Sequence, residues 1–180
     1  MCSSDLPGCD IRTLPNGVDV GYFAPRESLP PAPSAVFFGA MDYHANVEAA
    51  ELLARAVLPL LRQRHPDFRL TLAGANPAPA VQALAAIPGV TVTGYVQDIR
   101  PHVRGASVCA IPLRVARGVQ NKVLEAMALG VPVVASPGAA EGIDATPGED
   151  LCVAPADDGG KATAAAVASL LDDPARMTAM

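Results

Sequence analysis

The sequence has no tryptophan, and only 4% of its residues are aromatic and 17% charged. Lysine is nearly absent as well, because only Lys122 and Lys161 are lysines among the 13 basic residues, and the net charge is −5. This balance argues against sequence-independent binding to nucleic acids or anionic lipids, which needs a basic surface. No apolar run reaches the roughly 18–20 residues of a membrane span, since proline, glycine or arginine interrupts each one. We therefore expect a cytoplasmic domain.

The sequence also lacks the residue clusters that hold metals. Its four cysteines show no C-x-x-C spacing: Cys2, Cys9, Cys109 and Cys152. Two of them, Cys109 and Cys152, lie within apolar runs, where a thiol behaves as a small buried hydrophobe. The three histidines are far apart in the sequence, and none has a Cys, Asp or His cluster around it. We predict no metal site.

What is present is enough apolar sequence for one compact domain, with 51% apolar residues in a chain of 180. The segment from Cys2 to Leu6 back-translates to a sequence that resembles a common sequencing adapter, so we expect an artefact at residues 1–6 and exclude them from the fold prediction. The chain stops at Met180 inside a helical pattern, and we expect it to be C-terminally truncated. Residues 7–33 are rich in proline and glycine and predict an inter-domain segment and linker.

From residue 34 to residue 180, short apolar runs alternate with helical patterns. The strands are expected at 35–38, 68–73, 90–92, 107–111, 131–135 and 151–153, and the helices at 46–64, 81–86, 98–104, 118–129 and 160–171. Asn46 is expected as an N-cap, Pro59 as a kink and Gly130 as a C-terminal stop. Strands that are apolar without alternation are buried on both faces. The sequence therefore predicts an α/β fold with a doubly wound, mainly parallel, Rossmann-like sheet.

In such a sheet, ligands bind beyond the carboxyl ends of the strands. Three loops qualify, at 39–45, 94–97 and 114–122. The dinucleotide fingerprint G-x-G-x-x-G is absent after the first strand, which is followed by Gly39 alone. The run at 159–162 imitates the end of a phosphate-binding P-loop, but Ala162 stands where Ser or Thr would coordinate magnesium. Lys161 is therefore interpreted as an exposed residue at the start of a helix.

The third loop and the helix after it carry the most informative pattern. With helical spacing, Gly118, Asn121, Lys122 and Glu125 share one face. A helix start binds anions through its free N–H groups, so a diphosphate there and a ribose bound to Glu125 would satisfy both ends. The alternative is a local salt bridge between Glu125 and Lys122, and the spacing alone leaves both open.

The run from Gln120 to Ser136, with its core Glu-Ala-Met-Ala-x-Gly-x-Pro-Val-Val, resembles the C-terminal donor-binding domain of family 4 retaining glycosyltransferases, which have the GT-B fold. The likeness extends to Leu14–Asp19, Phe38–Tyr43 with Asn46, Gly94–Val96 with Asp98, and Pro112–Arg114. It covers roughly residues 11–175 and is greatest toward sugar transferases of PEP-CTERM exopolysaccharide clusters. One half of a GT-B fold is what the resemblance implies.

The resemblance also implies roles for individual residues. Glu125 matches the second Glu of the E-x7-E motif, which holds the ribose, whereas Arg117 replaces the first Glu. The residues expected to bind the donor are Gly39, Ala40, Tyr95, Val96, Arg114, Arg117, Gly118, Val119, Gln120, Asn121, Lys122 and Glu125. Of these, 118–120 would cradle the diphosphate, Gly39 and Ala40 would face the phosphates and sugar, and Tyr95 and Val96 would pack against the base.

The expected function is the donor half of a retaining glycosyltransferase that makes polysaccharide or glycoconjugate. The donor would be a UDP- or GDP-linked sugar, with no cofactor, and the catalytic residues lie partly in an acceptor domain that would precede residue 7. The acceptor would be a glycan or a lipid-linked glycan, and the full-length protein would sit at the inner face of the membrane. The alternatives are a GT-B-like nucleotide-sugar epimerase and a non-enzymatic α/β interaction domain.

Overall fold

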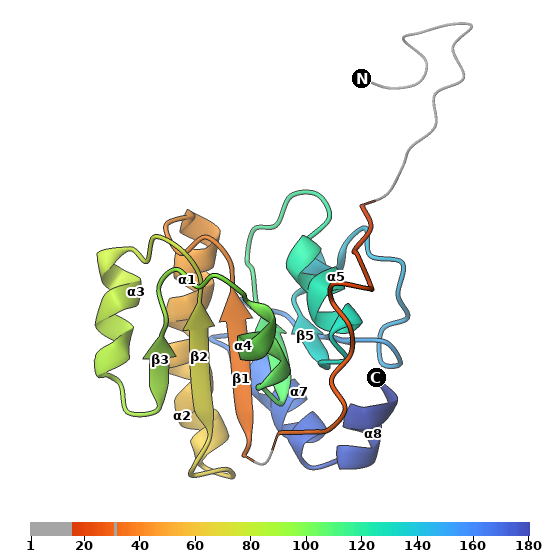
Figure 1. Cartoon of the computed structure of the whole chain (residues 1–180). Coiled ribbons are helices and arrows are strands. Elements are labelled where there is room, and N and C mark those ends of the chain that lie inside the picture. Colours follow the sequence, from red (N-terminus) through yellow and green to blue (C-terminus); the bar gives the residue numbers. More distant parts are fainter. Residues whose placement is uncertain (1–15, 31) are drawn as a thin grey trace, which may run out of the picture.

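The computed structural model describes residues 16–30 and 32–180 (Figure 1). Six parallel strands form one sheet in the order β3-β2-β1-β4-β5-β6. Their bounds are Ser34–Phe38 (β1), Arg69–Ala73 (β2), Val90–Val92 (β3), Val108–Ile111 (β4), Val133–Ala135 (β5) and Cys152–Val153 (β6). This is the doubly wound, Rossmann-like order, and it confirms the predicted fold class. The expected artefact at 1–6, together with Cys2 and Cys9, lies outside the described residues.

Helices cover both faces of the sheet. They are α1 (His44–Leu52), a π-helical segment (Leu53–Val57), α2 (Leu58–Arg62), α3 (Pro79–Ala83), a 3-10 turn (Leu84–Ala86), α4 (Arg100–Arg104), α5 (Asn121–Ala128), α6 (Pro137–Ala140), α7 (Lys161–Leu171) and α8 (Pro174–Ala179). Figure 1 shows α1 and α2 behind the sheet and α4 in front of it. Within the described part of the chain, no helix has the length and apolarity that crossing a bilayer requires.

The core consists of the strands themselves and the inner faces of the helices. Every residue of β4 is buried, as expected of a central parallel strand covered on both sides. Cys109 and Cys152 are buried and free, as predicted. Gly130 follows α5 with φ +66°, which is the left-handed conformation of a helix stop and confirms that prediction.

The helix predicted at 46–64 differs from the structure at its start and in its middle. It begins at His44, so Asn46 lies within the first turn and the prediction of an Asn46 N-cap was wrong. The irregularity around Pro59 takes the form of the π segment directly before α2. A proline has no N–H for the carbonyl four residues earlier and its ring crowds that carbonyl, so a wider turn accommodates it.

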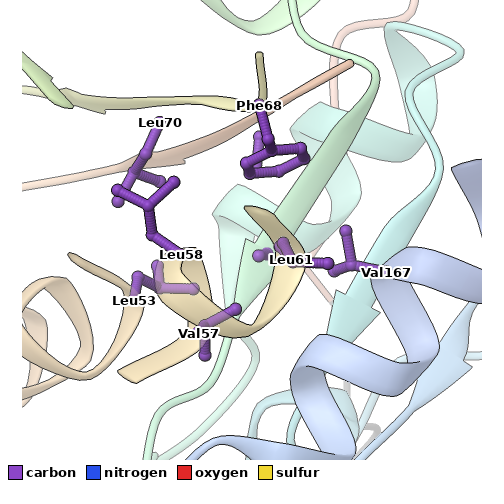
Figure 2. A pocket seen from close by; sticks show the side chains of 9 residues that line it. Leu53, Val57, Leu58, Leu61, Phe68, Leu70 and Val167 are labelled. Carbon is purple, nitrogen blue, oxygen red and sulfur yellow. The ribbon is translucent and has the colours of Figure 1, made fainter. Parts of the chain in front are cut away.

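The π segment and α2 press an apolar surface onto the sheet. Figure 2 shows Leu53, Val57, Leu58 and Leu61 facing Phe68 and Leu70 of the β2 region and Val167 of α7. All seven of these side chains are buried. Because no polar group lines this space, it is part of the hydrophobic core and has no feature of a ligand site.

Residues 16–30 run along α4 and α5, in front of the sheet in Figure 1. The Arg26 backbone N–H donates to the Leu129 carbonyl (3.0 Å), and its guanidinium donates to the carbonyls of Ala106 and Ser107. The Arg104 side chain donates in turn to the Ala24 carbonyl (3.0 Å). The segment 16–30, which was predicted to be part of a linker, is thus bound to the domain by arginine side chains.

Candidate functional site

The chain reverses its direction of winding between β1 and β4, which are neighbours in the sheet but far apart in sequence. In open parallel sheets, a crevice forms at this point beyond the carboxyl ends of the two strands. The loop that starts at Gly39 follows β1 there, and the loop that ends at Gln120 follows β4. The two predicted loops therefore meet at the place where ligands bind in this architecture.

The loops after β1, β2 and β3 are joined by backbone hydrogen bonds. Gly39 N–H donates to Ala73 (3.1 Å), Met41 N–H to Ala75 (2.9 Å) and Gly74 N–H to Gly94 (3.2 Å). A Cβ atom on Gly74, whose φ is +149°, would overlap the carbonyl oxygen of Gly39. Only glycine permits this close approach, so the three loops are held firmly together. We call the backbone of these loops, at Gly39–Met41, Gly74–Ala75 and Gly94, the floor of the crevice.

Lys122 lies beneath this floor, with its ammonium in the interior. Its Nζ donates a hydrogen bond to Asn46 Oδ1 (2.7 Å) and lies 4.6 Å from the ring centroid of Phe37. Asn46 is itself buried, and its Nδ2 donates to the Ala40 carbonyl (2.8 Å). One side chain of α5 is thus linked, through one side chain of α1, to the loop after β1.

Burial dominates the electrostatics of this cluster. It lowers the pKa of Lys122 to about 8, against an opposing effect of the negative charge of Glu125. It raises the pKa of the half-buried Glu125, which the positive charge of Lys122 opposes. It also raises the pKa of the Cys109 thiol, on β4, to about 12. Among the described residues, Lys122 and Glu125 form no ion pair within 4 Å, so the alternative of a local salt bridge was wrong.

The start of α5 differs from the prediction in one respect. The helix begins at Asn121, so Gly118 does not share its face and lies in the loop with φ +66°, surrounded by open space. The Gln120 side chain donates to the carbonyls of Arg117 (3.3 Å) and Gly118 (3.2 Å) and so shapes this loop. No side chain caps α5. The first N–H groups of the helix are therefore open to an anion.

The remaining predicted residues lie around this centre. Tyr95 is 77% exposed just after β3, two strands from β1, and Val96 and Val119 are half-buried. Ala40 and Arg117 are exposed. Arg114 is directed toward the β6 side, where its Nε lies 3.4 Å from the Ala156 carbonyl. The structure thus links Gly39 and Ala40 to Lys122 through Asn46, keeps residues 117–120 in the loop before α5, and leaves Arg114 and Tyr95 at the two sides.

Two contacts of the site could not be predicted from the sequence. Asn46 was taken for a helix cap, although it is the hydrogen-bond partner of Lys122. Asn16 was included in the linker, and its Nδ2 donates to Asn121 Oδ1 (2.9 Å). The one available signal was that Asn46 belongs to the residues that carry the family resemblance. A side-chain contact across 76 positions is not visible in local spacing.

Comparisons with known proteins identify the family to which the chain belongs. Residues 32–173 match the family model described as "Glycosyl transferases group 1". The chain is 32% identical, over 97% of its length, to a GDP-mannose-dependent alpha-(1-6)-phosphatidylinositol monomannoside mannosyltransferase of Mycolicibacterium smegmatis. It covers 50% of that protein, and it spans about half the length of the curated relatives it matches.

Two solved structures show the same fold. One is the C-terminal domain of a group 1 glycosyl transferase (LpcC) of Francisella tularensis, with a TM-score of 0.66 and 18% identity; the match covers 91% of this chain and 92% of that domain. The other is Anabaena HepE in complex with UDP-glucose, with a TM-score of 0.68 and 16% identity over 91% of this chain and 48% of that protein. At this level of identity, the likeness concerns the fold.

Proposed function

Since the chain belongs to the group 1 glycosyl transferases, we propose that it is the half of a retaining glycosyltransferase that binds a nucleotide-sugar donor. One observation carries the proposal: the uncapped start of α5 lies at the crevice between β1 and β4, with the half-buried Glu125 one turn further along the helix. Free N–H groups suit a diphosphate, and a half-buried carboxylate suits the hydroxyl groups of a ribose.

Different loop residues would then contact different parts of the donor. The backbone of 118–120 and the floor at Gly39 and Ala40 surround the diphosphate, and Val96 and the exposed Tyr95 face the base. Arg117, Asn121 and Lys122 add polar and positive groups around the phosphates, with Arg114 at the edge. Helix N–H groups and these cations would stabilise the departing nucleoside diphosphate electrostatically while the sugar is transferred.

The wider role follows from the same family. The donor is proposed to be linked to UDP or GDP, as with the relatives named above, whose own names mention GDP-mannose or UDP-glucose. The acceptor, a glycan or lipid-linked glycan, would bind a domain that precedes this one, with residues 7–33 as the connection. Exopolysaccharide synthesis at the inner face of the membrane is the setting that the sequence resemblance favours.

Calorimetric titration with UDP, GDP and their sugar conjugates tests the proposal. We expect saturable binding of one nucleotide, weakened about tenfold in Glu125→Ala, because a charged hydrogen bond contributes on the order of 1.4 kcal/mol. Glu51→Ala is the matched control, since Glu51 lies on α1 and faces Arg55. Absence of saturable binding at millimolar concentrations, or equal affinity in Glu125→Ala, contradicts the proposal. Release of free sugar or an epimer without an acceptor would favour the epimerase alternative.

A further inference from the structure

The side chain of Lys122 is half-buried, and its ammonium is largely withdrawn from water. Among the described residues, no carboxylate lies within 4 Å of it, and its polar contacts are with a neutral amide and an aromatic ring. Removing a charge from water without a counter-ion is unfavourable, and an apolar side chain would fill the same space at lower free energy. A charge kept in such a place is more consistent with a role in binding than with a role in folding.

The contacts of Lys122 lead to the floor of the crevice. The ammonium holds Asn46 Oδ1, and the other end of the same amide holds the Ala40 carbonyl. A Cβ atom on Gly39 would lie 3.1 Å from Nζ and 3.0 Å from Asn46 Nδ2, and φ at Gly39 is +146°. Gly39 therefore lets the lysine and the amide come up directly under the loop that was predicted to face the donor phosphates.

We propose that Lys122 is a positioning residue of the donor site, which sets the loop after β1 through Asn46 and whose charge is balanced by the diphosphate of the bound donor. The inference rests on the proposed function, because the anion it names is a nucleoside diphosphate. In this role Lys122 does not contact the donor from the surface; it acts on the loop after β1 from the interior, through the neutral amide of Asn46.

Four elements contribute groups near the Lys122 ammonium. Glu125 on α5 and Cys109 on β4 are the titratable groups that affect Lys122, while α1 contributes the Asn46 amide and β1 the Phe37 ring. The thiol is neutral and Glu125 acts on the ammonium only from a distance, so an incoming diphosphate adds negative charge next to Lys122. Binding of the anion and protonation of Lys122 must then favour each other to the same extent.

The scarcity of lysine makes this coupling measurable. In protein labelled with ¹³C at lysine, only Lys122 and Lys161 give side-chain signals, and Lys161 is exposed at the start of α7. The titration midpoint of each signal is measured without nucleotide and with saturating UDP or GDP, whichever binds in the calorimetric titration. We expect the Lys122 midpoint to rise by about one pH unit, equivalent to about tenfold tighter binding by the protonated form.

The possible outcomes distinguish a failure of the inference alone from a failure of the proposed function. A nucleotide that binds with measurable heat but leaves the Lys122 midpoint unchanged refutes the coupling and leaves the donor site standing. Absence of nucleotide binding overturns the proposed function, and the inference with it. Lys122→Met is expected to bind nucleotide about tenfold more weakly at pH 7, and Lys161→Met to bind it as the parent protein does.

A second variant tests the link through the amide. Asn46→Ala keeps the lysine and removes the bond to the Ala40 carbonyl. We expect the Met41 N–H, which donates to Ala75 across the floor, to exchange with solvent at least fivefold faster, with weaker nucleotide binding. Unchanged exchange at Met41, in a variant that remains folded by its thermal midpoint, refutes the positioning role.

Discussion

The starts of α5 and α7 look alike in the sequence and differ in the structure. Each follows a glycine-containing loop, and each has a lysine in its first turn, Lys122 in α5 and Lys161 in α7. At α7, the carboxylate of Asp158 accepts the Ala162 N–H (2.7 Å), so a side chain already occupies the helix start, and Lys161 is exposed. At α5 no side chain caps the helix, and the lysine is half-buried and turned toward Asn46 and the loop after β1.

The difference shows what makes a helix start suitable for an anion. Both helices present the same backbone dipole, so the dipole alone does not distinguish them. α5 combines three further properties: an uncapped end, a position at the crevice between β1 and β4, and a buried cation without a bonded carboxylate. α7 has none of these three, and its resemblance to a P-loop is limited to residue types.

The largest expected contrast between the two lysines is in the pH dependence of stability. The pKa of Lys122 in the folded state is about 8, below its ordinary value of 10.5, so the unfolded chain binds more protons between these pH values. The free energy of unfolding should therefore rise with pH across that window, relative to Lys122→Met, by up to about 3 kcal/mol. Denaturant unfolding at a series of pH values measures it. A flat line for Lys122→Met would contradict the buried charge.

Substitution of one glycine in each loop should destabilise the protein to different extents, because the loop before α7 is closely packed at Gly160 and the loop before α5 is open at Gly118. At Gly160, φ is +82° and a Cβ would lie 2.7 Å from Val57 Cγ2, whereas at Gly118 φ is +66° and nothing lies within 4 Å. Gly160→Ala is expected to lower the free energy of unfolding by about 2–3 kcal/mol through crowding and backbone strain together. Gly118→Ala should lower it by about 1 kcal/mol through strain alone. Chemical denaturation gives both values, and equal losses would contradict the open geometry at Gly118.

The smallest expected effect concerns the caps. Asp158→Ala removes the side-chain acceptor at the start of α7 and should lower the free energy of unfolding by about 1 kcal/mol. Gln120→Ala removes no cap, because the Gln120 side chain bonds only to loop carbonyls, so its effect should stay within about 0.5 kcal/mol. Thermal unfolding of the two variants compares them, and a larger loss in Gln120→Ala would mean that α5 is capped after all.

Sequence periodicity was sufficient to predict the fold class, the end of α5 and the exposed lysine at the start of α7. Apolar runs such as 108–111 predicted buried parallel strands, and Gly130 predicted the end of α5, because both depend on local rules of burial and backbone geometry. Lys161 was likewise correctly predicted as an exposed residue at a helix start. Each of these conclusions needs only neighbours within a few positions.

The start of α5 and the surroundings of Lys122 could not be predicted in this way, because they depend on contacts between residues distant in sequence. Helical spacing placed Lys122 beside Glu125 on one face, but it could not show that the ammonium turns toward Asn46, which comes from a different helix. Helical periodicity also extended α5 back to Gly118, where a positive φ ends the helical geometry. Burial and tertiary hydrogen bonds decide such cases, and neither is encoded in local spacing.

Backbone amide chemical shifts under titration with UDP or GDP distinguish the two helix starts as anion sites, because one spectrum reports both. We expect the nucleotide to shift the amides of Gly118 to Lys122 and of Gly39 and Ala40, while the amides of Gly159 to Ala162 stay in place. Shifts centred on the start of α7, or a spectrum unchanged at millimolar nucleotide, would contradict a donor site at the crevice between β1 and β4.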